Sequence, residues 1–196
     1  LGNARTALIA WWQARAQGSG FVMRIEDLDS QRSRPEFIAA NIAELNWLGL
    51  DWDEGPDIGG AHAPYLQSER QQAYEQTLEK LRVAGQIFDC YLSRKDLREV
   101  SSAPHGSMLP YGKRQRSLNE QLKVQKLAED KVPSLRFRVD KATVDFYDQL
   151  QGKQRFELGD FVLRRADMQW AYQLAVVADD IAMDISTISR VTNGRY

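Results

Sequence analysis

The sequence contains little cysteine, little histidine and no excess of charge of one sign. Its single Cys excludes a disulfide scaffold and a multi-cysteine metal site within these residues. No apolar run approaches the roughly 20 residues that a membrane-spanning helix requires. The net charge of −1 excludes a global basic field for nucleic acid, although a local basic patch would suffice to bind one.

The residues that are present indicate a globular chain. Of its 196 residues, 43% are hydrophobic, and five Trp, seven Tyr and seven Phe rule out disorder as the main state. No secretory signal pattern opens the sequence, so we expect a cytoplasmic protein. The chain begins with Leu1 and stops at Tyr196, and we expect it to be part of a longer protein.

Hydrophobic periodicity predicts helices that alternate with strands. Asn3 is expected to cap a helix that ends near Gly18, and residues 21–25 (FVMRI) are expected to form a buried strand. Capping boxes are expected at Ser33 and Ser68, at the start of two further helices. The remaining elements are expected at 87–91, 135–139 and 161–165 (strands) and 172–182 (helix). This alternation predicts an α/β fold with a parallel sheet.

The residue composition changes between residues 93 and 159, and we interpret this stretch as a small inserted α+β module. This stretch is locally basic, with the cations Arg114, Arg116, Lys123, Lys126, Lys131, Arg136, Arg138 and Lys141. One interpretation is that these cations, including Lys123, Lys126 and Arg136, contact the phosphates of an RNA. The other is that they only keep a helix and a half-exposed strand in solution.

Two short segments could bind charged ligands. Glu26 follows the predicted strand, where ligands of parallel sheets sit, and could bind an ammonium group, while Arg24 could pair with acids. The alternative for Glu26 is a solvated acidic turn that caps the next helix. Gly2 and Asn3 open a helix whose free N–H groups could bind phosphate, and the alternative there is a plain helix cap.

Together, these segments resemble a known enzyme family. The stretches 1–8 (LGNARTAL), 24–29 (RIEDLD), 47–56 (WLGLDWDEGP) and 65–70 (YLQSER) look like the catalytic core of glutamyl-tRNA synthetases. The stretches 102–106 (SAPHG), 159–167 (GDFVLRRAD) and 170–177 (WAYQLAVV) resemble their short paralogues, the glutamyl-Q tRNA(Asp) synthetases. The resemblance implies a Rossmann-like parallel sheet of class I aminoacyl-tRNA synthetases, with catalytic parts at 1–92 and 160–196 and the insertion at 93–159.

The resemblance also implies an activity and a set of site residues. The activity is that of a ligase: ATP-dependent activation of L-glutamate to glutamyl-adenylate and transfer to queuosine of tRNA(Asp), by a monomer without a membrane partner. Glu26, Tyr172 and Arg190 would bind glutamate, and Gly2 and Asn3 would bind ATP, which enters with Mg²⁺. No side chain has to form a covalent intermediate. For Tyr172 the alternative is a core aromatic residue, and for Arg190 a surface residue in a divergent tail.

The sequence departs from the family in three places. Of the zinc ligands, only Cys90 and Tyr111 are present, Leu92 offers no donor atom, and His105 would have to be recruited, so we expect no zinc. The family's N-terminal strand and its Lys-Met-Ser-Lys-Ser-type loop are also missing from these residues, which alone are not expected to catalyse the reaction. Two alternatives therefore stay open: the truncated core of a glutamyl-tRNA synthetase, and a non-catalytic RNA-binding paralogue.

Overall fold

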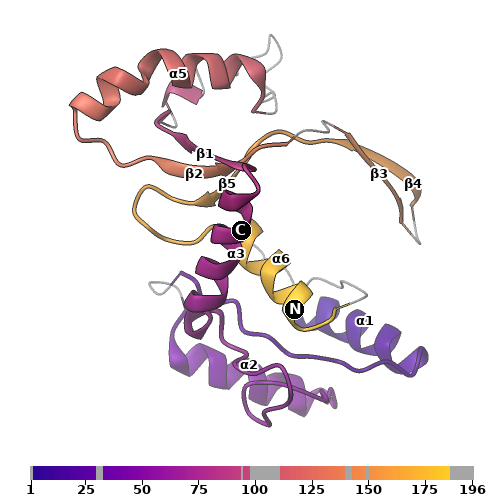
Figure 1. Cartoon of the computed structure of the whole chain (residues 1–196). Coiled ribbons are helices and arrows are strands. Elements are labelled where there is room, and N and C mark those ends of the chain that lie inside the picture. The colour runs from indigo at the N-terminus through magenta and orange to yellow at the C-terminus, as the bar shows by residue number, and fades with distance from the viewer. Residues whose placement is uncertain are drawn as a thin grey trace. The chain divides into compact units, whose positions relative to one another are not determined.

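The structure is a computed structural model that describes residues 2–29, 33–93, 95–97, 111–139, 143–148 and 151–185 (Figure 1). The chain forms two compact units. The first comprises Leu1–Tyr74 and Val176–Tyr196, and the second comprises Glu75–Ala175. The expected domain limits at 92/93 and 159/160 both fall within the second unit, and the insertion over 93–159 stays a prediction. No helix of the described residues is both long and apolar enough to cross a membrane.

The first unit contains α1 (Gly2–Ala16), α2 (Pro35–Trp47) and the short 3-10 helix η1 (Gln67–Glu69). It also contains the start of α3 (Gln71–Val83) and the end of α6 (Tyr172–Ala182). Helix α1 is attached to the loop that follows α2 by two side chains. Trp11 Nε1 donates to Asp51 at 2.5 Å, and Arg15 pairs with Asp51 and with Asp53 at 3.1 and 2.7 Å.

Residues 21–25 are extended, but they form isolated parallel bridges and not the expected strand. Val22 pairs with Glu54, and Ile25 pairs with Leu66. The N–H of Ile25 donates to the carbonyl of Tyr65 at 2.8 Å. No described segment extends the pairing beyond these bridges, so the five residues are half-buried where the sequence predicts burial on both faces.

Helices α1, α2, α3 and α6 form where periodicity predicts them, but the N-caps predicted for the first three are wrong. Helix α1 already includes Gly2, so Asn3 lies inside it. Helix α2 begins at Pro35, and Arg34 occupies the N-cap position without a side-chain hydrogen bond, so the box at Ser33 does not form. Ser68 directs its hydroxyl to Asp27 Oδ2 at 2.6 Å. In this bond the hydroxyl donates to a charged carboxylate. Such a bond is stronger than a cap bond, in which the hydroxyl would accept from a neutral backbone N–H.

The second unit contains an antiparallel sheet in the order β1-β2-β5 (Figure 1). The predicted parallel sheet is not formed by the strands of the described residues. Its strands are β1 (Ile87–Cys90), β2 (Ser134–Phe137) and β5 (Phe161–Arg164). Helix α5 (Lys113–Ala128) is fastened to β1 by the buried Asn119, whose side chain accepts from the N–H of Tyr91 and donates to the carbonyl of Asp89. Cys90, Leu92 and Tyr111 form a buried apolar cluster between them.

An exposed hairpin completes the second unit. It consists of β3 (Thr143–Asp148) and β4 (Gly152–Glu157), which pair antiparallel with each other. Phe146 and Phe156 stack on one face of the hairpin, with ring centroids 5.6 Å apart. The sequence analysis did not predict this hairpin.

Candidate functional site

The turn after residues 21–25 is fixed in place by the buried carboxylate of Asp27. Asp27 accepts two hydrogen bonds from Ser68, from the N–H at 2.8 Å and from the hydroxyl at 2.6 Å. Together with the bridge between Ile25 and Leu66, these bonds hold the backbone on both sides of Glu26. The side chain of Glu26 therefore projects from a rigid support, as a ligand-binding carboxylate requires.

Glu26 pairs with the arginine two residues before it. Arg24 Nη2 lies 3.2 Å from Glu26 Oε1, and Arg24 also donates to Asp180 at 2.8 Å. The Arg24 guanidinium is mostly buried, with 13% of its side chain exposed. Burial lowers the pKa of Arg24, but Asp180, Asp179 and Glu26 raise it by more, so the group stays charged.

Asp179 lies at the centre of a buried polar network in the first unit. Its Oδ1 accepts from Arg70 Nε at 2.6 Å, and its Oδ2 accepts from Gln67 Nε2 at 2.8 Å and from the Tyr74 hydroxyl at 2.9 Å. Asp179 and Gln67 are both fully buried. Burial, followed by the charge of Asp179, raises the pKa of Tyr74, so its hydroxyl stays protonated and remains a donor.

The charges of this network do not cancel. Among the described residues, its members are two guanidinium groups and three carboxylates, which leaves a formal surplus of one negative charge: Arg24, Arg70, Glu26, Asp179 and Asp180. Of the three carboxylates, Glu26 is the most exposed, with 23% of its side chain accessible against 11% for Asp180 and none for Asp179. The cluster therefore presents its surplus charge at Glu26, where a cationic group of a ligand could bind.

Sequence reasoning found Glu26 and its partner Arg24, but it missed the roles of Asp179 and Asp180, which bind Arg24 from α6. A pattern that could have revealed them is the pair Asp179–Asp180 within the apolar helix YQLAVVADDIA. Carboxylates on the apolar face of a helix are buried only where cations or donors meet them. In the structure, Arg24 and Arg70 are the cations that meet these two carboxylates.

The other predicted site residues lie elsewhere or outside the described residues. Tyr172 is the first residue of α6 and is 36% exposed, so it is not the core aromatic residue that was the alternative. Gly2 and Asn3 form the first turn of α1. Arg190 lies outside the described residues, as does His105.

The zinc-site remnants are in contact, but they do not fit a zinc ion. Cys90 Sγ and the Tyr111 hydroxyl are hydrogen-bonded at 3.4 Å. Burial, followed by this hydrogen bond, raises the pKa of Tyr111, so its phenol stays protonated. Structural zinc requires four ligands, and Leu92 has no donor atom. Among the described residues, no cluster of three or more His, Cys, Asp or Glu could hold a metal ion.

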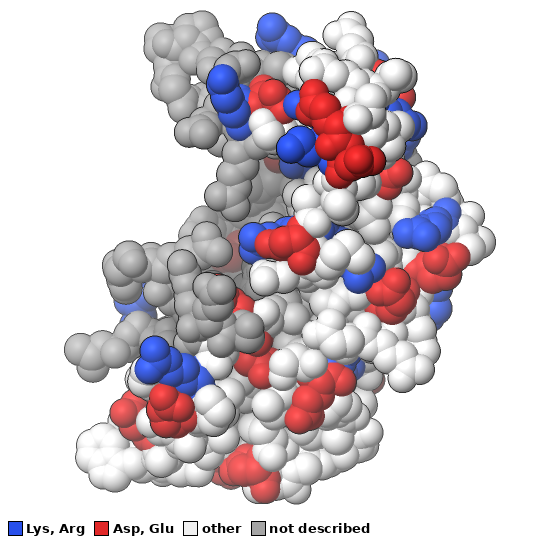
Figure 2. All heavy atoms as spheres, turned by 90° about the vertical axis from the view of Figure 1, so that its left-hand side faces the viewer, with Lys and Arg blue, Asp and Glu red and all other residues white. Residues whose placement is uncertain are grey.

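Two of the predicted RNA-binding cations are bound to groups within the second unit. Arg136 is buried, lies 4.3 Å from the ring centroid of Tyr111, and donates to the carbonyl of Asp160. Arg116 binds both carboxylate oxygens of Asp160. The expectation that Arg136 contacts RNA is therefore wrong. Figure 2 shows basic and acidic side chains lying next to one another on one face of the molecule.

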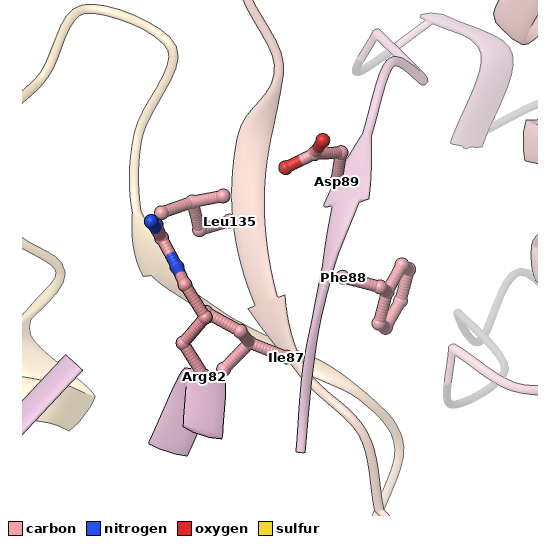
Figure 3. Close-up of a pocket in the computed structure, with 5 residues that line it drawn as sticks. All are labelled: Arg82, Ile87, Phe88, Asp89 and Leu135. Atoms are coloured by element: carbon pink, nitrogen blue, oxygen red, sulfur yellow. The ribbon is translucent and has the colours of Figure 1, made fainter. Parts of the chain in front are cut away.

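A small open pocket lies beside β1 and β2 (Figure 3). Its volume is about 320 Å³, and its lining is Arg82, Ile87, Phe88, Asp89 and Leu135. None of the predicted ligand-binding residues lines it.

Comparison with known proteins identifies the family. Residues 1–193 match the family model for class I tRNA synthetases (E and Q), catalytic domain. The chain is 48% identical to the glutamyl-Q tRNA(Asp) synthetase of Symbiobacterium thermophilum, over 97% of this chain and 61% of that protein. It is 39% identical to the glutamate–tRNA ligase of the same organism, over 97% of this chain and 41% of that protein.

A solved structure agrees with this match. The glutamate tRNA ligase of Elizabethkingia meningosepticum, crystallised with its amino acid, superimposes with a TM-score of 0.76 at 28% identity, over 92% of this chain and 39% of that one. The chain thus spans about three fifths of the glutamyl-Q relative and two fifths of the ligases. Its α/β fold and its motifs place it among the class I tRNA synthetases for glutamate and glutamine, within their catalytic domain.

Proposed function

We propose that the protein containing this chain activates L-glutamate with ATP and transfers it to queuosine of tRNA(Asp), as a glutamyl-Q tRNA(Asp) synthetase. The observation that carries this proposal is the matched comparison within one organism. The same 97% of the chain is 48% identical to the glutamyl-Q enzyme and 39% identical to the glutamate–tRNA ligase of Symbiobacterium thermophilum. The rival proposals are the core of an ordinary glutamyl-tRNA synthetase and a non-catalytic RNA-binding paralogue.

The chemistry of this reaction depends on position more than on side-chain participation. The α-carboxylate of glutamate attacks the α-phosphorus of ATP, which forms glutamyl-adenylate and releases pyrophosphate. A hydroxyl of queuosine then attacks the acyl carbon, loses its proton and displaces AMP. The protein has to hold the reacting atoms in line and match their charges. Mg²⁺ would enter with ATP as part of the substrate.

The glutamate site of this proposal is built around Glu26. The surplus negative charge of the polar cluster supports binding of the substrate ammonium group there. Tyr172 and Arg190 are proposed to bind the rest of glutamate, with Arg190 pairing with a carboxylate in the two-pronged geometry of a guanidinium. Gly2 and Asn3 are proposed to contact ATP, because the first turn of α1 presents free N–H groups.

The Rossmann-like sheet and the RNA surface also belong to this proposal. The parallel bridges of Val22 and Ile25 support a parallel sheet that includes residues 21–25. With Arg136 buried and Arg116 bound to Asp160, the exposed cations Arg114 and Lys131 support contact with tRNA phosphates by the second unit. Action on a tRNA fits a cytoplasmic protein.

The full-length protein is expected to attach glutamate only to tRNA(Asp) that contains queuosine. The measurement is incorporation of labelled glutamate, with ATP, into three RNAs: queuosine-containing tRNA(Asp), the same tRNA without queuosine, and tRNA(Glu). Charging of tRNA(Glu) would favour the ordinary synthetase. The absence of both charging and glutamate-dependent pyrophosphate exchange would favour the non-catalytic paralogue.

Glu26→Gln is expected to weaken glutamate binding about 10- to 100-fold without weakening ATP binding. The reason is that loss of a charge-assisted contact in a partly desolvated site costs roughly 1.5–3 kcal/mol. Calorimetric titration of the full-length protein with each substrate measures both constants. Glu36→Gln, the same change on the exposed side of α2, is the control and should change neither constant. An unaltered glutamate dissociation constant in Glu26→Gln would refute the assignment.

A further inference from the structure

Arg24 is shared between Glu26 and the carboxylates of α6. It contacts Asp180 at 2.8 Å, Glu26 at 3.2 Å and Asp179 at 3.7 Å. Asp179 already accepts three hydrogen bonds, one of them from the charged Arg70 at 2.6 Å. Asp180, by contrast, has Arg24 as its only ion-pair partner among the described residues. Asp180 is therefore the carboxylate that mainly balances the charge of Arg24.

This division of charge decides what Glu26 can bind. While Asp180 balances Arg24 and Asp179 balances Arg70, Glu26 retains the surplus negative charge of the cluster. Without the charge of Asp180, the cluster would hold two cations and two carboxylates, and Glu26 would become a main partner of Arg24. An ammonium group would then meet a carboxylate that is already neutralised.

We propose that Asp180 is a positioning residue that balances the charge of Arg24, so that Glu26 keeps its negative charge for a ligand. In this way Asp180 sets the preference of the site for an α-amino acid over its des-amino analogue. This role rests on the proposed binding of the glutamate ammonium group by Glu26. Asp180 itself is nearly buried and acts through Arg24, without touching the substrate.

The geometry at Asp180 makes the charge removable without a steric change. Its Oδ1 accepts from Arg24, and its buried Oδ2 has no hydrogen-bond partner among the described residues. In Asp180→Asn the amide oxygen can take the place of Oδ1, and the NH₂ group can take the place of the unpartnered Oδ2. No donor then faces another donor, so the variant is expected to fold.

The test compares L-glutamate with glutarate, which has the same carbon chain and both carboxylates but no ammonium group. In the full-length protein, Asp180→Asn is expected to weaken glutamate binding about tenfold and to leave glutarate binding unchanged. Asp180→Glu, which keeps the charge, should restore most of the preference for glutamate. Asp180→Ser is a second charge-removing variant should the Asn protein fail to fold. Asp51→Asn, which removes an exposed partner of Arg15, is the control.

A double-mutant cycle separates this role from a structural one. In the Glu26→Gln background, removing the charge of Asp180 should have no further effect on glutamate binding, because the ligand-binding carboxylate that Arg24 would neutralise is already absent. Equal weakening of glutamate and glutarate, unchanged binding of both, or additive losses in the double variant would each overturn the role of Asp180. If Glu26→Gln alone leaves glutamate binding intact, the proposed ammonium site itself is wrong.

Discussion

Asp179→Asn is expected to lower the free energy of unfolding by about 3–5 kcal/mol, because it removes one partner of a buried ion pair. Both oxygens of Asp179 accept hydrogen bonds, from Arg70 on one side and from Gln67 and Tyr74 on the other. Whichever way the Asn side chain turns, its NH₂ group meets a donor. Arg70 also loses its buried counter-charge and, among the described residues, keeps the carbonyls of His62 and Pro64 as acceptors.

Urea denaturation followed by tryptophan fluorescence and circular dichroism measures this effect. The neighbouring Asp180→Asn is the matched control, since it replaces the same residue type one position along α6, where only one oxygen is hydrogen-bonded. Its expected loss is smaller, about 1–2 kcal/mol, because Arg24 keeps Glu26 and Asp179 as partners. Equal losses in the two variants would contradict the central role of Asp179 in the network.

Asp160→Asn is expected to lower the free energy of unfolding of the second unit by about 3 kcal/mol. This value is at the low end of the cost of breaking a buried ion pair, because Arg116 is partly exposed. Asp160 has a fully buried side chain that accepts from Arg116 at both oxygens and from the N–H of Val139 at 2.9 Å. The Asn side chain would again present its NH₂ group to a donor. Arg116 would lose its carboxylate partner.

The hairpin offers a control with the same geometry at the surface. Asp145 binds Arg155 through two hydrogen bonds, at 2.6 and 2.9 Å, with 62% and 72% of the two side chains exposed. Water screens such a pair, so Asp145→Asn should leave the unfolding midpoint unchanged. The same urea titrations measure both variants. A change at Asp145 as large as that at Asp160 would show that burial is not the cause.

The sequence predicts the helices well where apolar spacing is regular. The limits of α6 agree with the prediction at both ends, and α2 and α3 lie within the predicted segments. The predicted cap at Ser68 fails because its hydroxyl has a competing partner. Ser68 binds Asp27, a residue 41 positions away, and no local pattern contains that partner.

Local sequence patterns predict the strands and the site less well than the helices. An apolar run such as residues 21–25 predicts an extended segment, but the extent of its pairing depends on distant residues, here Glu54 and Leu66. Likewise, Glu26 could be recognised from its motif, whereas the role of Asp179 depends on donors more than 100 positions earlier. Arg136 was predicted to contact RNA but is buried, since a basic residue on an alternating strand can equally face the interior.

The separation of Asp179 from its partners has a consequence for the order of folding during translation. Asp179 follows Gln67, Arg70 and Tyr74 by 112, 109 and 105 residues. At a synthesis rate of roughly 5–20 residues per second, Arg70 waits roughly 5–20 seconds for its carboxylate on the ribosome. All residues of the second unit, Glu75–Ala175, are made within that interval. The unit made in the middle of the chain can therefore fold first, while the unit that begins earlier has to wait to complete its polar interior.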